Sequence, residues 1–542
     1  MGLAIILDVF LTVVLIMGCS SHRTDVPVTA TANPPATATE EVEIQDTPTA
    51  NPNNPKLLGP LFVNPDNRRY FTDGTLVNGK YKVIYLAGAH TWCDLSDCDD
   101  KNPVQAIFNY EEYLDFVQSH GYNFFKLWRS ETSGGGENGP NFWFSPMPYQ
   151  RSATVCCAYD GGNKFDLTKF NQAYFDRMRT RVIEARDRGM YVSVMLFDGW
   201  SVDSKYTEHV PWLGHPYNIV NNVNNIDGDV DNNGQGEETH ILLGTAVTAL
   251  QEAYVRKVID TVNDLDNVLY EISNESPGDD PATPVFDGSR DWQYHMIQLV
   301  KGYEAGKPKQ HAVGMTWEWL NGNNQYLYDS PADWISLGGN LNLDVYSPPA
   351  TTGALNSKII LADTDHLCGI CGSQQWVWKS FTRGENPIFM DIYDETVSGR
   401  GLPFNNPNEI EIRRNLTYVK SYALRMNMVN MSPRPDLCST TYCLANPVAN
   451  GTEYLVYVPA GVEAGNILNS LGIDKRLRIY LPEDGKVSVD LTGSPAELKV
   501  QWFNPADGTY VDGGSVQGGS TQSFTSPIWG DAVLYIYDAH KP

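Results

Sequence analysis

The stretch Asn267-Val268-Leu269-Tyr270-Glu271-Ile272-Ser273-Asn274-Glu275 decides the expected fold of this chain. It is a short apolar run that ends abruptly in an amide and a carboxylate. In a barrel of parallel strands, the residues at the carboxyl ends of the strands carry the chemistry. The stretch therefore predicts a barrel strand that delivers Asn274 and Glu275 to an active-site rim. The alternative is a Glu275 that favours the start of a following helix, since Ser276-Pro277 come next.

Outward from this stretch, short apolar runs alternate with helical patterns from residue 61 to about residue 432, which predicts parallel strands with crossover helices. The clearest unit begins at Asp166, a predicted helix N-cap, continues through a helix that includes Phe170, and ends at Gly189. Eight strands in this length fit an α/β domain, a (β/α)8 TIM barrel over residues 57–432. The expected strands are 83–87, 124–128, 191–197, 268–272, 312–315, 334–337, 359–362 and 388–390.

The pattern changes after a last helix near residues 408–428. Short apolar segments broken by Gly, Pro and Asp then predict a small all-β sandwich domain over residues 433–542. Its expected strands are 453–458, 477–481, 486–491, 498–503 and 532–536.

The N-terminal segment predicts export. Residues 3–17 form an apolar run that is too short for an ordinary membrane span, so residues 1–19 are expected to be a signal peptide. The end of the run, Ile16-Met17-Gly18-Cys19-Ser20, resembles a bacterial lipobox and implies lipidation of Cys19; a plain secretory signal is the alternative. Residues 20–56 are rich in Thr and Pro and predict a disordered tether. We therefore expect a lipid-anchored protein on the bacterial cell surface or outer membrane, held to the membrane through that anchor only.

Charge and cysteine content agree with an extracellular protein. The net charge of −26 would repel nucleic acid and favours an uncharged substrate, while nothing in the sequence indicates the oligomeric state. Without Cys19, eight of the nine cysteines remain, an even number that suits an oxidising compartment. The spacings that allow local disulfides are Cys93 with Cys98, Cys156 with Cys157, Cys368 with Cys371, and Cys438 with Cys443. Zinc is the alternative for the C-x-x-C pair.

Polar and aromatic residues follow almost every predicted barrel strand, strand six excepted. Indoles stack on the apolar faces of sugar rings, while amides, carboxylates and imidazoles bind sugar hydroxyls. Such residues at one rim predict a carbohydrate site. The candidates for substrate contact are His90, Trp92, Arg129, Asp198, Trp200, Asn274, Trp317, Glu318, His366 and Asp391.

The Asn274-Glu275 pair resembles the pair that closes strand four of clan A glycoside hydrolases, the cellulase- and apiosidase-like barrels. The resemblance implies that Glu275 is the general acid/base and that Arg129 keeps the nucleophile ionised. Strand seven departs from the clan, because its acid is Asp and not Glu. Alignment of the apolar strand implies Asp363 as the nucleophile, with Asp365 as the alternative. In the C-terminal region, 502–505 and 530–535 resemble the collagen-binding-type domain that follows several glycosidase families.

The resemblance implies an extracellular glycoside hydrolase that needs no cofactor for catalysis. It also implies double displacement, with retention of configuration. Retention requires the two carboxyl groups about 5–5.5 Å apart and inversion about 6.5–9.5 Å apart, and the sequence does not give that separation. The sequence also leaves open the sugar and endo or exo cleavage. A glycan-binding surface lipoprotein without catalysis is the alternative. A serine hydrolase is disfavoured, since the sequence holds no G-x-S-x-G.

A separate motif lies between strands three and four. From Asp229 the sequence reads D-x-D-x-N-G, the opening of a calcium loop, with Asp229, Asp231, Asn233 and Gln235 as expected ligands. His240 stands where such loops carry a Glu, and Glu237 or Glu238 could substitute for it. Any calcium here would be structural, and a Gly- and Asn-rich surface loop is the alternative.

Overall fold

The computed structural model describes residues 57–135, 142–202, 210–279, 288–319, 321–339, 358–393, 406–460 and 485–539. The predicted signal peptide, its Cys19, the tether and the predicted strand 477–481 lie outside these residues. Within the described ranges, none of the helices is both long enough and apolar enough to cross a membrane.

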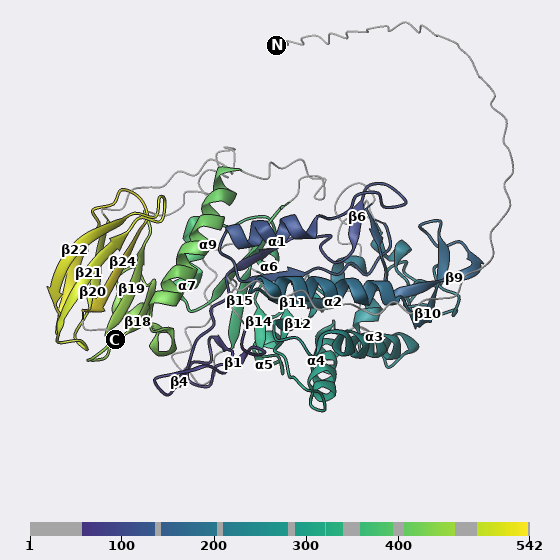
Figure 1. Ribbon diagram of the computed structural model, residues 1–542, viewed down its shortest axis with the longest axis horizontal. Coiled ribbons are helices and arrows are strands. Elements are labelled where there is room, and N and C mark those ends of the chain that lie inside the picture. The colour runs from purple at the N-terminus through teal and green to yellow at the C-terminus, as the bar shows by residue number, and fades with distance from the viewer. Residues whose placement is uncertain are drawn as a thin grey trace, which may run out of the picture. The chain divides into compact units, whose positions relative to one another are not determined.

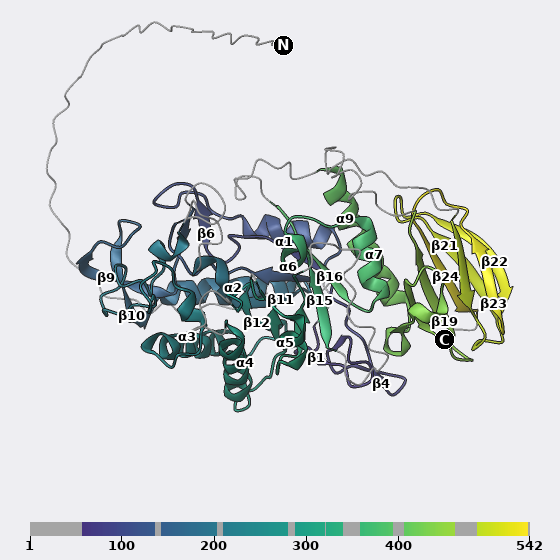
Figure 2. The same cartoon turned by 180° about the vertical axis from the view of Figure 1, so that it is seen from behind.

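Eight parallel strands close into a barrel, as the sequence predicts. Figures 1 and 2 show these strands at the centre with helices around them. In chain order they are β5 (Gly88–His90), β7 (Phe124–Leu127), β11 (Tyr191–Asp198), β12 (Val268–Asn274), β13 (Val313–Thr316), β14 (Trp334–Ser336), β15 (Ile359–Asp363) and β16 (Asn386–Met390). Each strand pairs with its neighbours in the chain order of the barrel, and β16 closes it on β5.

The first barrel strand begins later than the sequence predicts. Residues 83–87 were expected to form it, whereas β5 covers Gly88–His90. The reason lies in two asparagines, because Asn386 and Asn123 accept from the backbone N–H groups of Leu86 and Ala87. Side chains thus take the place of strand pairing before β5 starts.

The helices that cover the barrel are α1 (Tyr110–Ser119), α2 (Gln172–Asp187), α3 (Ala246–Val262), α4 (Arg290–Glu304), α5 (Asn324–Asp329), α6 (Thr364–Cys368), α7 (Gln374–Thr382) and α9 (Pro407–Arg425). The predicted start of α2 was wrong. Asp166 and Phe170 belong to a strand, β10 (Asn163–Phe170), which pairs with β9 (Tyr149–Cys156), so the helix begins only at Gln172. Its predicted end is confirmed by Gly189, whose φ of +74° suits glycine at a helix terminus.

Shorter elements decorate the barrel and the long loops. They are β1 (Phe62–Val63), β2 (Phe71–Thr72), β3 (Leu76–Val77), β4 (Lys80–Tyr81), β6 (Asp97–Asp99), β8 (Trp143–Ser145), and the 3-10 turns η1 (Gly199–Ser201), η2 (Pro211–Gly214), η3 (Glu237–His240), η4 (Met428–Asn430) and η5 (Pro435–Leu437). Within the described residues, the long segments after β7 and β11 therefore contain short elements of their own.

An antiparallel β domain follows the barrel, as predicted. One sheet has the order β17-β18-β19-β24-β21-β22, and β20 pairs with β23 in a separate ribbon. The strands are β17 (Ser432–Pro433), β18 (Cys443–Asn446), β19 (Glu453–Val458), β20 (Lys486–Asp490), β21 (Glu497–Phe503), β22 (Tyr510–Gln517), β23 (Thr521–Thr525) and β24 (Ala532–Asp538). The sequence did not predict β22, because its side chains are almost all exposed and the usual alternation is missing.

The β domain packs directly on the helices α7 and α9. Trp378 of α7 lies against Tyr457 and Phe503, with ring centroids 6.4 and 5.8 Å away, and these side chains belong to the same apolar core as the barrel. Gln374 adds a polar contact by donating to Asp531 over 2.8 Å. The opposite face of the sheet forms its own core with β20 and β23.

Three disulfides join cysteines that are close in the sequence: Cys93–Cys98, Cys156–Cys157 and Cys368–Cys371. The Cys368–Cys371 disulfide disfavours the zinc alternative, because both sulfur atoms of the C-x-x-C pair are bonded to each other. The predicted bridge between Cys438 and Cys443 is absent among the described cysteines; both are buried free thiols.

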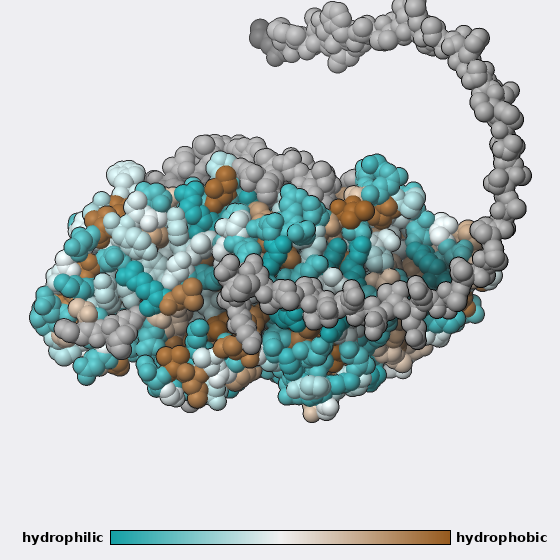
Figure 3. All heavy atoms as spheres, viewed as in Figure 1, coloured by the Kyte–Doolittle hydropathy of each residue, from teal (hydrophilic) through white to brown (hydrophobic). Residues whose placement is uncertain are grey.

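One face of the molecule shows how hydrophobic residues are distributed on the surface. On the face in Figure 3, hydrophobic residues form small separate patches among hydrophilic ones. This fits the acidic composition of the chain.

Candidate active site

Glu275 stands one residue beyond β12, at the carboxyl end of the barrel, with only 1% of its surface exposed. Its φ of +44° is a left-handed backbone conformation that costs a non-glycine residue about 1–3 kcal/mol. Gly199 makes the conformation possible, because a Cβ at that position would lie 2.1 Å from the carbonyl oxygen of Glu275. Trp200 then donates its indole N–H to Oε2 of Glu275 over 2.6 Å. The turn after strand three thus fixes both the backbone and the carboxylate of Glu275.

Asn274 is held by His366 of α6 and, through it, by Ser336 of β14. His366 Nε2 donates to its Oδ1 over 2.9 Å, and Ser336 Oγ lies 2.7 Å from the other ring nitrogen. This arrangement fixes the amide so that Nδ2 points elsewhere. Nδ2 is buried and has no hydrogen-bond partner among the described residues. A buried donor without a partner is costly, and a ligand oxygen would satisfy it.

Asp363, the last residue of β15, is buried in a cationic environment. His90 Nε2 lies 3.0 Å from its Oδ1, and Lys126 Nζ lies 2.7 Å from its Oδ2. Oδ1 also accepts from the backbone N–H of Asp365 at the start of α6. Although burial opposes ionisation, the charges of His90 and Lys126 hold the pKa of Asp363 well below its usual range. Asp363 is therefore an ionised carboxylate whose oxygens are already bound.

Asp365, in the first turn of α6, is partly exposed. Burial of its carboxyl group, followed by the negative charge of Glu275, raises its pKa to about 7. Glu275 is the largest charged contributor to this shift. His366, which follows Asp365, contacts Asn274, which precedes Glu275, over 2.9 Å, so the two acids lie at the same end of the barrel. Oδ2 of Asp365 has no hydrogen-bond partner among the described residues. Strands four and seven thus bring together an acid pair, Glu275 with Asp365.

Lys126 occupies the interior of the barrel and was missed in the sequence. Besides Asp363 it contacts Glu271, whose Oε1 lies 3.1 Å from Nζ. Burial raises the pKa of Glu271 to about 7, and the charge of Lys126 opposes that shift. A lysine within the apolar run Phe124–Leu127 and a glutamate within Val268–Asn274 were the signals that could have revealed this pair.

Arg129 lies in a buried cluster next to the site, and its expected part in keeping the nucleophile ionised stays a prediction. Its guanidinium lies 3.3 Å from Glu131 and 3.9 Å from the ring centroid of Tyr254. Glu131 also accepts from His240 over 3.0 Å. The charge of Arg129 is thus used within a neighbouring buried cluster, whereas Lys126 and His90 are the cations beside Asp363.

Several other residues that were predicted to contact the substrate bind neighbouring protein groups instead. Asp391 forms two hydrogen bonds with Arg413, and Asp198 accepts from Ser201 and from the backbone of Trp200. His90 is fully buried and stacks on Trp128, so it acts through Asp363. These residues therefore support the site through contacts with other protein groups.

The strand-five residues lie nearer the rim. Glu318 is buried and accepts from Ser289 over 2.9 Å, and burial raises its pKa to about 7. Trp317 is largely buried, because Gly338 and Gly339 leave room for its ring. The half-buried Trp319 lies 5.9 Å from Trp200, centroid to centroid. Trp92 on the strand-one side is also half-buried.

The predicted calcium loop is only partly assembled as expected. Asp229 and Asp231 lie together, and the third carboxylate of the cluster is Glu238. The Oδ1 atom of Asn233 instead accepts from the backbone N–H of Gln235.

Comparisons with known proteins bear on both parts of the chain. Residues 454–536 match the family described as "Putative collagen-binding domain of a collagenase". No curated protein matches the sequence. The C-terminal domain is therefore of the collagen-binding type.

Solved structures match nearly the whole chain. One described as a glycoside hydrolase has a TM-score of 0.52 and 13% identity, with 90% of this chain and 99% of that one covered. A glycoside hydrolase family 5 protein from Bacteroides vulgatus has a TM-score of 0.51 and 14% identity, with 89% and 94% covered. At such identities the likeness establishes the fold alone: a TIM barrel followed by an antiparallel β domain.

Proposed function

We propose that this chain, whose fold is the clan A-like barrel of glycoside hydrolases, hydrolyses glycosidic bonds of an oligo- or polysaccharide outside the cell. The observation that carries the proposal is the acid pair. Glu275 follows strand four and Asp365 follows strand seven, both at the carboxyl end of the barrel, and their neighbours Asn274 and His366 are in contact over 2.9 Å. Two carboxyl groups at this place are what glycoside hydrolysis requires.

In the proposed mechanism, Glu275 donates a proton to the leaving oxygen while the carboxylate of Asp365 attacks the anomeric carbon. Glu275 then takes a proton from water, which releases the sugar with retention of configuration. The buried Asn274 Nδ2 supplies a donor to a sugar hydroxyl. Trp200 and Trp319 offer indole surfaces beside the acid pair.

We prefer Asp365 to Asp363 as the nucleophile, although the aligned strand favoured Asp363. Both oxygens of Asp363 are engaged by His90, Lys126 and the backbone of α6, and none of its surface is exposed. Asp365 has an oxygen with no partner among the described residues. Asp363 is then a positioning residue that fixes the first turn of α6.

The cellular location remains our proposal as well. An exported chain, lipidated at Cys19 and tethered through residues 20–56, would present the barrel to polymeric glycans outside the cell. A glycan-binding protein without catalysis is the second candidate, favoured only by the indoles at the rim.

A panel of aryl glycosides and glycans of different linkage tests the proposal with the full chain. Release of reducing ends or of the aryl group, with the anomeric configuration of the first product read by NMR, would establish hydrolysis and retention. Glycan binding with no cleavage of any panel member would contradict the proposal and favour the binding protein.

The rate should depend on pH in a way set by the acid pair. With the pKa of Asp365 raised to about 7 by burial and by the charge of Glu275, the proposed nucleophile is protonated in acid and becomes ionised as the pH rises through about 7. Because attack on the anomeric carbon needs the carboxylate, kcat/KM should rise with pH up to about 7. A profile measured between about pH 4 and about pH 9 that stays flat on the acid side would contradict this.

Trp200→Phe should lower kcat about tenfold, because the variant keeps an aromatic ring but loses the indole N–H that binds Glu275. We expect a smaller change in KM. Trp319→Phe is the matched control at the neighbouring indole, and its main effect should be on KM. Equal kcat losses in the two variants would mean that the bond to Glu275 has no special importance.

A further inference from the structure

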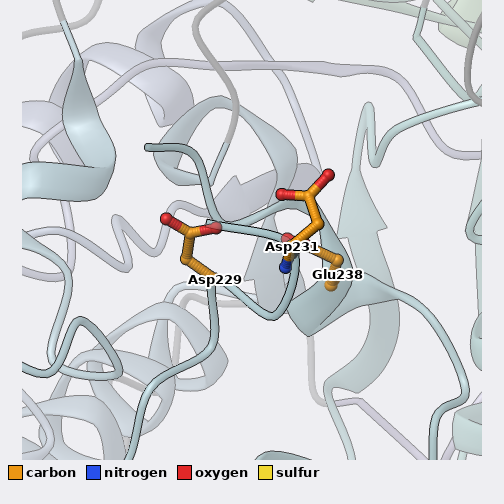
Figure 4. Close-up of side chains that lie close together, drawn as sticks. All are labelled: Asp229, Asp231 and Glu238. Carbon is orange, nitrogen blue, oxygen red and sulfur yellow. Dashed lines mark hydrogen bonds between the residues drawn. The ribbon is translucent and has the colours of Figure 1, made fainter. Parts of the chain in front are cut away.

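The loop Asp229–Glu238 contains an acidic cluster that the proposed reaction does not use. Carboxylate oxygens of Asp229, Asp231 and Glu238 all lie within 4.8 Å of one another (Figure 4). Two oxygens bound to one Ca²⁺ at about 2.4 Å can be at most about 4.8 Å apart. The spacing therefore fits a common calcium ion.

Glu238 supplies the independent reason to expect a ligand. Only 3% of its surface is exposed. Its Oε1 accepts from the backbone N–H of Asp231 over 3.0 Å, whereas Oε2 is buried and has no hydrogen-bond partner among the described residues. A buried carboxylate oxygen beside two further carboxylates is costly unless a cation neutralises them.

The backbone of the loop already holds the carboxylates in place. The oxygens of Asp229 accept from the N–H groups of Asn233 and Gly234, and Gly234 has a φ of +89° that suits glycine. The chain thus turns sharply at the sixth residue of the motif, the position at which calcium loops carry an invariant glycine.

We propose that Asp229, Asp231 and Glu238 form a structural calcium site. Three carboxylates provide hard oxygen ligands, and their net charge favours a divalent cation. The ligand set differs from the one the motif predicts, because Glu238, two residues before the usual final position, supplies the last carboxylate. No step of the proposed hydrolysis passes through the ion.

The site connects to the acid pair through the short turn η3. Glu238 and His240 both belong to η3. His240 is fully buried, contacts Glu131, and lies 2.9 Å from the hydroxyl of Ser276. Ser276 follows Glu275 directly. A bound ion would therefore fix the segment that supports the residue next to the proposed acid.

The test uses the full chain, freed of metal with a chelator, with CaCl₂ alone as the probe. Calorimetric titration should show one bound Ca²⁺, and the melting temperature should rise by about 2–4 °C at Ca²⁺ concentrations near a hundredfold over Kd. Mg²⁺ at the same concentration should give less, because it prefers shorter bonds and octahedral geometry.

Asp231→Asn is the informative variant, because the side chain is exposed and the substitution should leave folding intact. We expect it, together with Asp229→Asn, to weaken Ca²⁺ binding at least tenfold and to abolish the rise in melting temperature. Asp227→Asn is the matched control, since it removes the same charge two residues before the cluster and should leave binding unchanged. No calcium binding by the unsubstituted chain, or equal binding by Asp231→Asn and Asp227→Asn, would overturn the proposal. Both readouts are independent of hydrolysis, so the site can fail or succeed by itself.

Discussion

Glu275→Gln should lower kcat about 10²–10⁴-fold on substrates with poor leaving groups, since that is the usual contribution of general acid–base catalysis. Glutamine keeps the size of the side chain and can still accept from the Trp200 N–H over a similar distance. It cannot donate a proton to the leaving oxygen. The variant should therefore fold normally, and its loss should shrink on aryl glycosides whose leaving group needs no protonation.

Asp365→Asn should behave differently, because a nucleophile is required whatever the leaving group is. We expect a loss of similar or greater size that does not shrink on activated aryl glycosides. Measuring kcat/KM for both variants on a poor and an activated substrate therefore assigns the two roles. Azide should restore turnover to both variants, but with retention in Glu275→Gln and with inversion in Asp365→Asn, because it replaces a different group in each.

Two controls keep this experiment decisive. Glu318→Gln changes another buried carboxyl group at the rim whose pKa is also raised to about 7 by burial, and it should cost far less activity. Asp363→Asn tests the other assignment. A folded Asp363→Asn variant with the azide-rescued, inverting behaviour, beside an active Asp365→Asn variant, would make Asp363 the nucleophile.

The second large effect concerns stability. Lys126→Met should lower the free energy of unfolding by about 3–5 kcal/mol, the usual cost of removing one partner from a buried ion pair. Lys126 is 1% exposed and contacts both Asp363 and Glu271, so its loss leaves two buried carboxylates without their shared cation. Urea titration monitored by tryptophan fluorescence would measure the change.

Arg179→Met is the matched control, since it removes a cation from the exposed pair with Asp264 and should cost less than about 1 kcal/mol. The pH dependence provides a further check. Without Lys126 the pKa values of the two carboxyl groups rise above those of the unfolded chain, so protonation favours the folded state and stability is lost as the pH rises. The deficit should therefore be smaller near pH 5 than near pH 8. Equal losses in the two variants would show that the buried pair has no particular importance.

The repeating pattern of the chain was enough to predict the barrel, because short, mostly apolar runs alternate with helical segments along the chain. The shift of the first strand depends on Asn123 and Asn386, which lie far away in the sequence and bind the backbone of residues 86–87. The start of α2 was missed for a related reason. Residues 163–170 pair with β9, the strand just before them in the chain, and such pairing can override local helical signals.

The site residues that directly follow a strand could be predicted from the sequence. The residues that pair with one another inside the barrel could not. Asn274, Glu275 and Asp365 follow directly from their strands. The choice of Lys126 over Arg129 as the cation beside Asp363 depends on which side chains point into the barrel, and a one-residue difference in register reverses that. Ser336 on strand six was missed because a single serine in a strand carries no signal until His366 is placed beside it.

The direct packing of Trp378, Tyr422 and Phe503 has a consequence for how such a protein meets a polymer. Many accessory domains are joined to a catalytic domain by a flexible linker, so the two domains can reorient relative to each other. Here α9 ends at Arg425 and β17 begins at Ser432, while the sheet shares an apolar core with the barrel. If the outer strands of the β domain bound a glycan, the shared core would fix the distance and angle between that glycan and the proposed active site.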